Sequence, residues 1–119
     1  LKRLILSRPF FERVNDQSVV AGDEGERYDR ILVSRGSGYL MAYSFTGRDF
    51  RLHMGRISGD TVRAWWYDTR TGEAYEIGEY DNNGSMSFDP PGVEHSGNDW
   101  VLVLDDTSKG YDKPGLVAN

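Results

Sequence analysis

A chain of 119 residues has room for one domain, and its 38% apolar and 13% aromatic content is enough for a packed core, which excludes wholesale disorder. The formal net charge of −5, from 14 basic and 19 acidic residues, argues against a nucleic-acid-binding protein, because such proteins need a concentrated basic surface to displace counterions from phosphates. The absence of cysteine excludes disulfides, cysteine-bound zinc and cysteine nucleophiles.

The first nine residues have the pattern of a connector. Leu1, Leu4 and Ile5 lie at helical spacing, and the helix would end at residues 7–9, because the residue before a proline is pushed out of the helical region. The chain does not begin with methionine, and neither a signal peptide nor a membrane-spanning run of about 20 apolar residues is visible. We therefore expect residues 1–9 to be the end of a helix from a preceding domain, in a fragment of a longer protein.

The central part of the chain has the pattern of short β-strands separated by turns that contain Gly, Asp and Pro. Apolar and polar side chains alternate with period two, and turn signals recur roughly every ten residues. The expected strands cover residues 28–34, 39–45, 49–54, 62–67, 75–77, 85–88 and 99–106, with a short extended piece at 19–21. About seven or eight strands without an internal helix predict an all-β fold, an antiparallel β-sandwich, over residues 10–107, and residues 108–119 have the composition of a loose tail.

The segment 99–106 is the most continuously apolar part of the chain, with apolar residues on both faces of the expected strand. Such a pattern is typical of an interior strand that is covered on both sides. We expect the N-terminal connector or a neighbouring domain to cover its second face.

The clearest element is a β-hairpin over residues 62–77, with a turn at Asp68-Thr69-Arg70-Thr71-Gly72. Short polar side chains and a glycine that tolerates positive φ are typical of such a connection. Alternation places Trp65 and Tyr67 on one face beside Arg63, and the second strand resumes at Tyr75.

The aromatic face of this hairpin is the best candidate for a binding surface. Sugar rings and extended peptides dock on flat aromatic rings, while flanking polar groups fix their orientation. The candidate ligand-binding residues are Trp65, Tyr67, Tyr75, Arg63 and Arg70. The alternative is that one face of the hairpin packs in the core and the other under a neighbouring strand, loop or domain.

The sequence predicts no catalytic residue, metal site or cofactor. His53 and His95 are not spaced as a ligand pair, and no nucleophile elbow is present. Asp105 and Asp106 are adjacent on a strand, so their side chains would point to opposite faces and would not form a pair across a cleft. The acidic loop 23–26 does not have the ligand spacing of a calcium loop.

Several motifs, spread over residues 4–107, form a specific combination. They are SRPFFERV at residues 7–14 with DQ at 16–17, RAWWYDTRTGE at 63–73, PPG at 90–92 and GNDWVLVLDD at 97–106. Together they resemble the family named "putative collagen-binding domain of a collagenase". In that family the domain usually sits at the C-terminus of bacterial proteins, behind a (β/α)8 barrel of glycoside-hydrolase type.

The resemblance implies an all-β, non-catalytic C-terminal accessory domain of a bacterial carbohydrate-active enzyme, which packs on and supports the catalytic barrel. The catalytic carboxylates would lie in that barrel, and the preceding catalytic domain would be the partner. The alternative is an independent binding module for a polysaccharide or a collagen-like polymer. We expect the parent enzyme to be extracellular or periplasmic, although the chain itself carries no signal for either.

Overall fold

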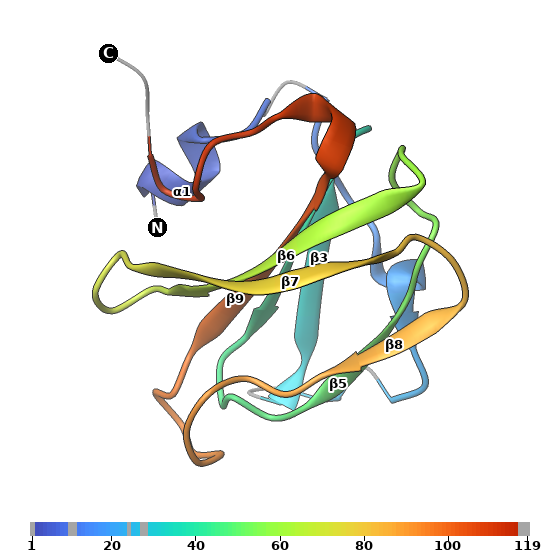
Figure 1. Cartoon of the computed structure of the whole chain (residues 1–119). Coiled ribbons are helices and arrows are strands. Elements are labelled where there is room, and N and C mark those ends of the chain that lie inside the picture. Colours follow the sequence, from blue (N-terminus) through green and yellow to red (C-terminus); the bar gives the residue numbers. More distant parts are fainter. Residues whose placement is uncertain (1, 10–11, 24, 27–28, 117–119) are drawn as a thin grey trace.

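The protein folds as two antiparallel β-sheets packed on one another (Figure 1). The computed structural model describes residues 2–9, 12–23, 25–26 and 29–116, so the expectations for other positions, including the first residue of the strand at 28–34 and the end of the tail, lie outside the described residues. The larger sheet has the strand order β1-β3-β4-β9-β6-β7, and the smaller sheet has the order β2-β5-β8. The predicted antiparallel β-sandwich is therefore confirmed.

The elements are short. The strands are β1 (Val14–Asn15), β2 (Val20–Ala21), β3 (Ile31–Arg35), β4 (Tyr39–Ser44), β5 (Phe50–His53), β6 (Thr61–Asp68), β7 (Ala74–Asp81), β8 (Ser85–Phe88) and β9 (Trp100–Asp106). The helices are α1 (Lys2–Leu6) and the 3-10 turns η1 (Gln17–Val19) and η3 (Thr107–Lys109). The helix expected near the N-terminus is present as α1, whereas β1 was not expected, because a strand of two residues has no alternation to detect. Within the described ranges, no helix has the length and apolarity needed to cross a membrane.

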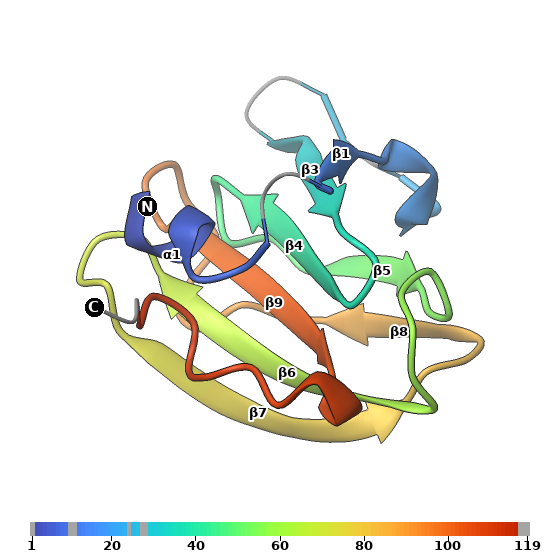
Figure 2. The ribbon, with the colours of Figure 1, turned by 90° about the horizontal axis from the view of Figure 1, so that it is seen from above.

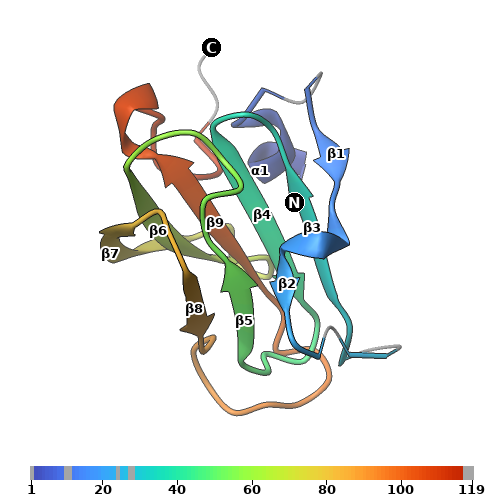
Figure 3. The ribbon, with the colours of Figure 1, turned by 90° about the vertical axis from the view of Figure 1, so that its right-hand side faces the viewer.

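The main core lies between the two sheets. Alternate residues of β3, β4, β9 and β6 point toward the smaller sheet, and their apolar side chains pack against those of β2, β5 and β8. Phe50 is central to this layer, with its ring centroid 6.0 Å from that of Trp66 and 6.3 Å from that of Phe88. The smaller sheet thus covers one face of the larger sheet (Figure 3).

The opposite face of the larger sheet, which we call the outer face, is covered in part by the two ends of the chain. Figure 2 shows α1 and the C-terminal segment lying over β9 and β6. Leu4 of α1 and Tyr111 of the C-terminal segment pack with outward-facing residues such as Val103. All residues of β9 are buried, so the prediction of an interior strand covered on both faces is confirmed.

The hairpin formed by β6 and β7 has the predicted turn. Asp68 N–H donates to Glu73 O, and Gly72 N–H donates to Asp68 O, both over 2.8 Å. Gly72 has φ 79°, a conformation that glycine adopts without steric cost. The connection at 69–72 holds an even number of residues, and this number places Tyr75 opposite Trp66 and leaves Tyr67 opposite Ala74.

Candidate functional site

The predicted binding residues lie on two different faces of the larger sheet. Trp65 and Tyr67 are on the outer face, where both pack in the cluster that contains Leu4 and Val103. Tyr67 is only 2% exposed. Tyr75 stands opposite Trp66 and therefore points to the other face. The expectation that the three rings share one exposed platform is wrong, because the even connection reverses the face of Tyr75.

Arg63, also on the outer face, is held by two carboxylates of β7. Its guanidinium lies 2.8 Å from Glu79 Oε1 and 3.1 Å from Glu76 Oε1. The hydrogen bond from Arg63 to Glu79 raises the pKa of the guanidinium, while burial opposes that shift. The side chain is thus engaged in a cross-strand charge cluster.

Arg70 and Tyr75 come together on the indole of Trp100. The Arg70 Cζ atom lies 5.4 Å from the centroid of the Trp100 ring, and the Tyr75 ring centroid lies 6.3 Å from it at an interplanar angle of 57°. Tyr75 is 52% exposed, and the neighbouring Ile77 is also exposed. We call Arg70, Tyr75, Ile77 and Trp100 the hairpin-end patch.

The patch has a rigid base in the loop that precedes β9. The Trp100 indole N–H donates to Asn98 Oδ1 over 3.0 Å. Asn98 is itself buried, and its Nδ2 donates to Pro91 O and Val93 O over 2.9 and 3.1 Å. The sequence pattern predicts Trp100 as part of an interior strand and indicates no role for Asn98, although both belong to the GNDW motif at residues 97–100.

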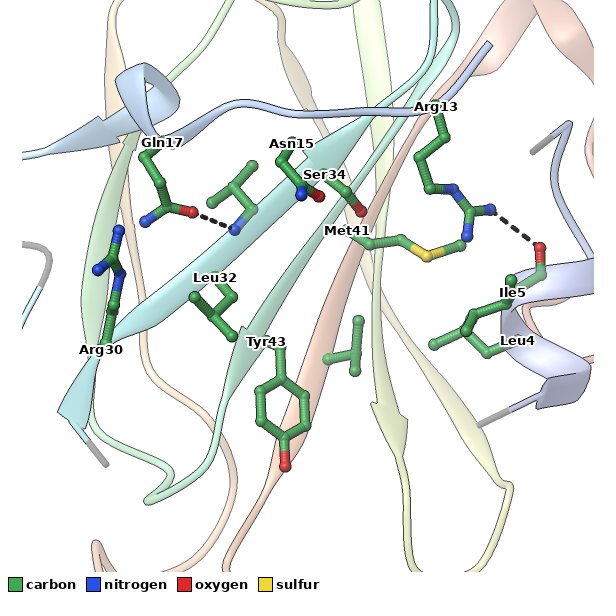
Figure 4. A pocket seen from close by; sticks show the side chains of 12 residues that line it. Leu4, Ile5, Arg13, Asn15, Gln17, Arg30, Leu32, Ser34, Met41 and Tyr43 are labelled. Atoms are coloured by element: carbon green, nitrogen blue, oxygen red, sulfur yellow. Dashed lines mark hydrogen bonds between the residues drawn. The ribbon is translucent and has the colours of Figure 1, made fainter. Parts of the chain in front are cut away.

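A second surface is a groove on the outer face, beside α1, with a volume of about 650 Å³. Figure 4 shows its lining, which is supplied by α1, the segment 13–17 and the strands β3, β4 and β9. The residues are Leu4, Ile5, Arg13, Asn15, Gln17, Arg30, Leu32, Val33, Ser34, Met41, Tyr43 and Val101. We call this surface the outer groove. Leu32, on its floor, is 51% exposed.

Polar contacts at the margins give the outer groove its shape. Arg13 joins α1 to β4, since its Nε donates to Tyr39 Oη over 2.8 Å and its Nη2 donates to Ile5 O over 2.9 Å. Gln17 caps the edge of β3, where it donates to Ile31 O and accepts from Val33 N–H. These contacts fix both walls of the groove.

Tyr43 closes one end of the outer groove. Its hydroxyl donates to Asp99 Oδ2 over 3.1 Å. Burial, together with this hydrogen bond, raises the pKa of Tyr43 to about 12, so the hydroxyl is protonated at neutral pH. Sequence patterns did not indicate the groove, because its walls come from segments that are far apart along the chain.

A buried ion pair holds the N-terminal segment on the sheet. Arg8 Nε and Nη2 donate to the two carboxylate oxygens of Asp105 over 2.9 and 2.7 Å. Arg8 Nη2 also donates to Asp112 O over 2.8 Å, and the Arg8 Cζ atom lies 4.9 Å from the Tyr111 ring centroid. Burial raises the pKa of Asp105, and the hydrogen bonds from Arg8 oppose that shift. Arg8 therefore ties the residues after α1 to β9 and to the C-terminal segment.

These features define a β-sandwich domain that presents open surfaces, and no three His, Asp or Glu side chains among the described residues are grouped so that they could hold a metal ion. The family model described as "Putative collagen-binding domain of a collagenase" matches residues 14–105. The chain belongs to this family, and the resemblance seen in the sequence is confirmed.

Two solved structures show where related domains occur. A chain described as a glycoside hydrolase is 50% identical over 93% of this chain, with a TM-score of 0.89. A glycoside hydrolase family 5 protein from Bacteroides vulgatus ATCC 8482 is 44% identical over 98% of this chain, with a TM-score of 0.90. This chain spans 25% of the length of each. A comparison with curated proteins gives no match.

Proposed function

We propose that this chain is a non-catalytic accessory domain of a glycoside hydrolase, and that the outer groove is the surface on which the catalytic domain of the same protein packs. The single observation that carries the proposal is the half-covered outer face. Its β9 side lies under α1 and the C-terminal segment, while the β3 side is open at the outer groove.

The composition of the outer groove supports a protein partner. Ile5 and Leu32 are large apolar side chains that remain exposed around it, and Met41 and Val101 extend the apolar lining. Contiguous exposed apolar surface of this kind marks interaction sites in soluble proteins. Covering a side chain the size of Leu32 is worth about 1.5–3 kcal/mol, so a few such contacts are enough to couple two domains.

The position of the groove supports a partner within the same chain. The N-terminal end of this chain lies at α1, which forms one wall of the groove (Figure 2). The similar glycoside hydrolase chains are about four times as long as the matched part, since the match covers 25% of each. A catalytic domain joined at α1 would therefore lie within reach of the groove.

The charge of the groove indicates what the partner surface presents. Arg13 and Arg30 belong to its lining, and no Asp or Glu is among the described residues that line it, although the whole chain has a net charge of −5. We expect the facing surface of the catalytic domain to be apolar in the centre and acidic at the rim, because such a surface complements the groove in both respects.

The proposal is tested by Leu32→Asp in two settings, the 119-residue chain and the full-length enzyme. Since Leu32 is 51% exposed in the chain, the substitution should destabilise the chain alone by no more than about 1 kcal/mol, the span of strand propensities. In the full-length enzyme it should lower the melting temperature of the catalytic domain and separate one calorimetric transition into two. Tyr75→Ala, on the opposite face, is the matched control and should keep the single transition. A full-length Leu32→Asp protein that unfolds like the wild type would contradict the proposal.

A further inference from the structure

We propose that the hairpin-end patch is a binding site for a neutral polysaccharide, with a pyranose ring stacked on Tyr75. This function goes beyond the accessory role and does not depend on it. The patch faces away from the outer groove, because Tyr75 shares its face with Trp66, which is a residue of the core between the sheets. A domain docked in the outer groove would therefore leave the patch open to solvent.

The exposed ring is supported from below. Tyr75 is 52% exposed, yet its ring rests on that of Trp100, which is itself buried and packs in the main core. The Trp100 N–H is fixed by Asn98. A ring held in this way loses little side-chain freedom when a ligand covers it, and the free energy of stacking is retained as affinity. The C–H-rich face of a pyranose matches one flat aromatic ring.

Arg70 supplies oriented donors beside the ring. Its backbone N–H and its Nε donate to Asp68 Oδ1 over 2.9 and 3.0 Å, and its guanidinium lies over Trp100. The terminal nitrogens Nη1 and Nη2 donate no hydrogen bond to any residue within the described ranges. These nitrogens can donate to sugar hydroxyl oxygens while the bond to Asp68 fixes the plane of the guanidinium.

The shape and the charge of the region favour a neutral glycan. Exposed apolar surface in the patch is limited to Tyr75 and the adjacent Ile77, which is enough for one or two sugar rings. A collagen-like triple helix would instead need a long series of contacts. The net charge of −5 disfavours a polyanionic chain, although Arg70 alone could pair with a uronate.

The test is affinity gel electrophoresis of the 119-residue chain in gels that contain β-1,4-xylan, galactomannan, arabinogalactan or polygalacturonate, with pelleting on fibrillar collagen in parallel. We expect at least one neutral polysaccharide to retard the chain. Tyr75→Ala should weaken that interaction roughly tenfold, which corresponds to the loss of one stacking contact. Tyr75→Phe, which keeps the ring, should bind like the wild type.

Two further variants keep the result interpretable. Leu32→Ala changes a side chain of matched exposure (51%) in the outer groove, and it should be retarded like the wild type. Arg70→Ala, which keeps the Tyr75 ring, should also weaken binding. Circular dichroism would show that each variant is folded. The proposal is overturned if no neutral polysaccharide retards the chain, if Tyr75→Ala is retarded as strongly as the wild type, or if only polygalacturonate or collagen is bound.

Discussion

Arg8 and Asp105 form a two-point ion pair whose side chains are 0% and 5% exposed, and the pair joins the residues after α1 to the central strand β9. Arg8 also donates a hydrogen bond to the backbone oxygen of Asp112 in the C-terminal segment. Because both side chains are out of water, removing either one would leave buried polar atoms of the other without a hydrogen-bond partner. This pair acts with the hydrogen bond from Arg13 to Ile5 O to hold α1, and with it one wall of the outer groove, on the sheet.

Replacing Arg8 with Ala should destabilise the chain by about 3–5 kcal/mol, because the carboxylate of Asp105 would stay buried after losing both of its hydrogen bonds from Arg8. Chemical denaturation of the 119-residue chain at pH 7 measures this loss. The double variant Arg8→Met with Asp105→Leu should recover most of it, since an apolar pair of similar volume leaves no charge to desolvate. Equal losses in the single and double variants would show that the ion pair is not the source of the effect.

The two tyrosines of the hairpin should respond differently to truncation. Tyr67 is 2% exposed and packs in the outer-face cluster, whereas Tyr75 is 52% exposed. Tyr67→Ala should cost about 3–5 kcal/mol of unfolding free energy, like other losses of a large buried ring. Tyr75→Ala should cost less than about 1 kcal/mol. Similar losses at both positions would contradict the difference in burial between the two rings.

The contrast between these tyrosines shows how far the sequence could be used to predict the site. The hairpin and its glycine turn were predictable, because alternation and turn chemistry are local signals. The face of Tyr75 was not predictable. It depends on whether the turn holds an odd or an even number of residues, and both kinds of turn are common in hairpins. The structure has the even number, with the turn at 69–72. The candidate binding residues were therefore predicted as one surface, whereas the structure divides them between two faces of the larger sheet.

Other features depended on contacts that only the folded chain creates. The apolar run of β9 correctly predicted a strand buried on both faces, because such a strand has apolar residues at consecutive positions instead of alternate ones. The outer groove is formed where α1, the segment 13–17 and β3 come together. The periodicity of apolar residues reports local structure only, so it does not predict contacts between such separate segments. The packing of Tyr111 on the outer face also differs from the loose tail that its polar neighbours suggested.

Gly47 should be a sensitive position for the base of the hairpin-end patch. It has φ 73°, and a Cβ atom there would lie 2.5 Å from Asn98 Nδ2 and 2.7 Å from Asn98 O. Gly47→Ala should therefore cost more than the roughly 1–2 kcal/mol expected for left-handed backbone strain alone, because Asn98 would also have to move. Thermal unfolding measures the loss, and the fluorescence of Trp100 should change with it.

Gly97→Ala provides the matched control for that substitution. Gly97 has φ 95° in the same region of the molecule, but a Cβ atom there would meet nothing within 4 Å. It should show only the cost of the backbone conformation. If Gly47→Ala is no more destabilising than Gly97→Ala, the close approach of the 46–47 turn to Asn98 has no energetic importance.

Asp106 should make the domain less stable as the pH is lowered into the acid range. Its carboxylate accepts from Ser58 Oγ over 2.6 Å and from Ser108 N–H and Oγ over 2.9 and 2.8 Å. These hydrogen bonds, first of all that from Ser58, lower the pKa of Asp106 in the folded chain. The unfolded chain therefore binds a proton at Asp106 more readily than the folded chain does. The stability that the ionised group contributes is present above its unfolded pKa, near 3.9, and is lost as the pH falls below that value.

The expected result is that the free energy of unfolding decreases between about pH 5 and pH 2 in the wild type, and that this decrease is smaller in Asp106→Asn. Urea denaturation at a series of pH values measures both slopes. Part of the decrease should remain in the variant, because hydrogen bonds from Ser18 and Arg35 also lower the pKa of Asp16. Asp89→Asn, at an exposed position, is the control and should follow the wild-type slope. An Asp106→Asn protein with the full acid dependence would show that the hydrogen bonds to Asp106 do not govern it.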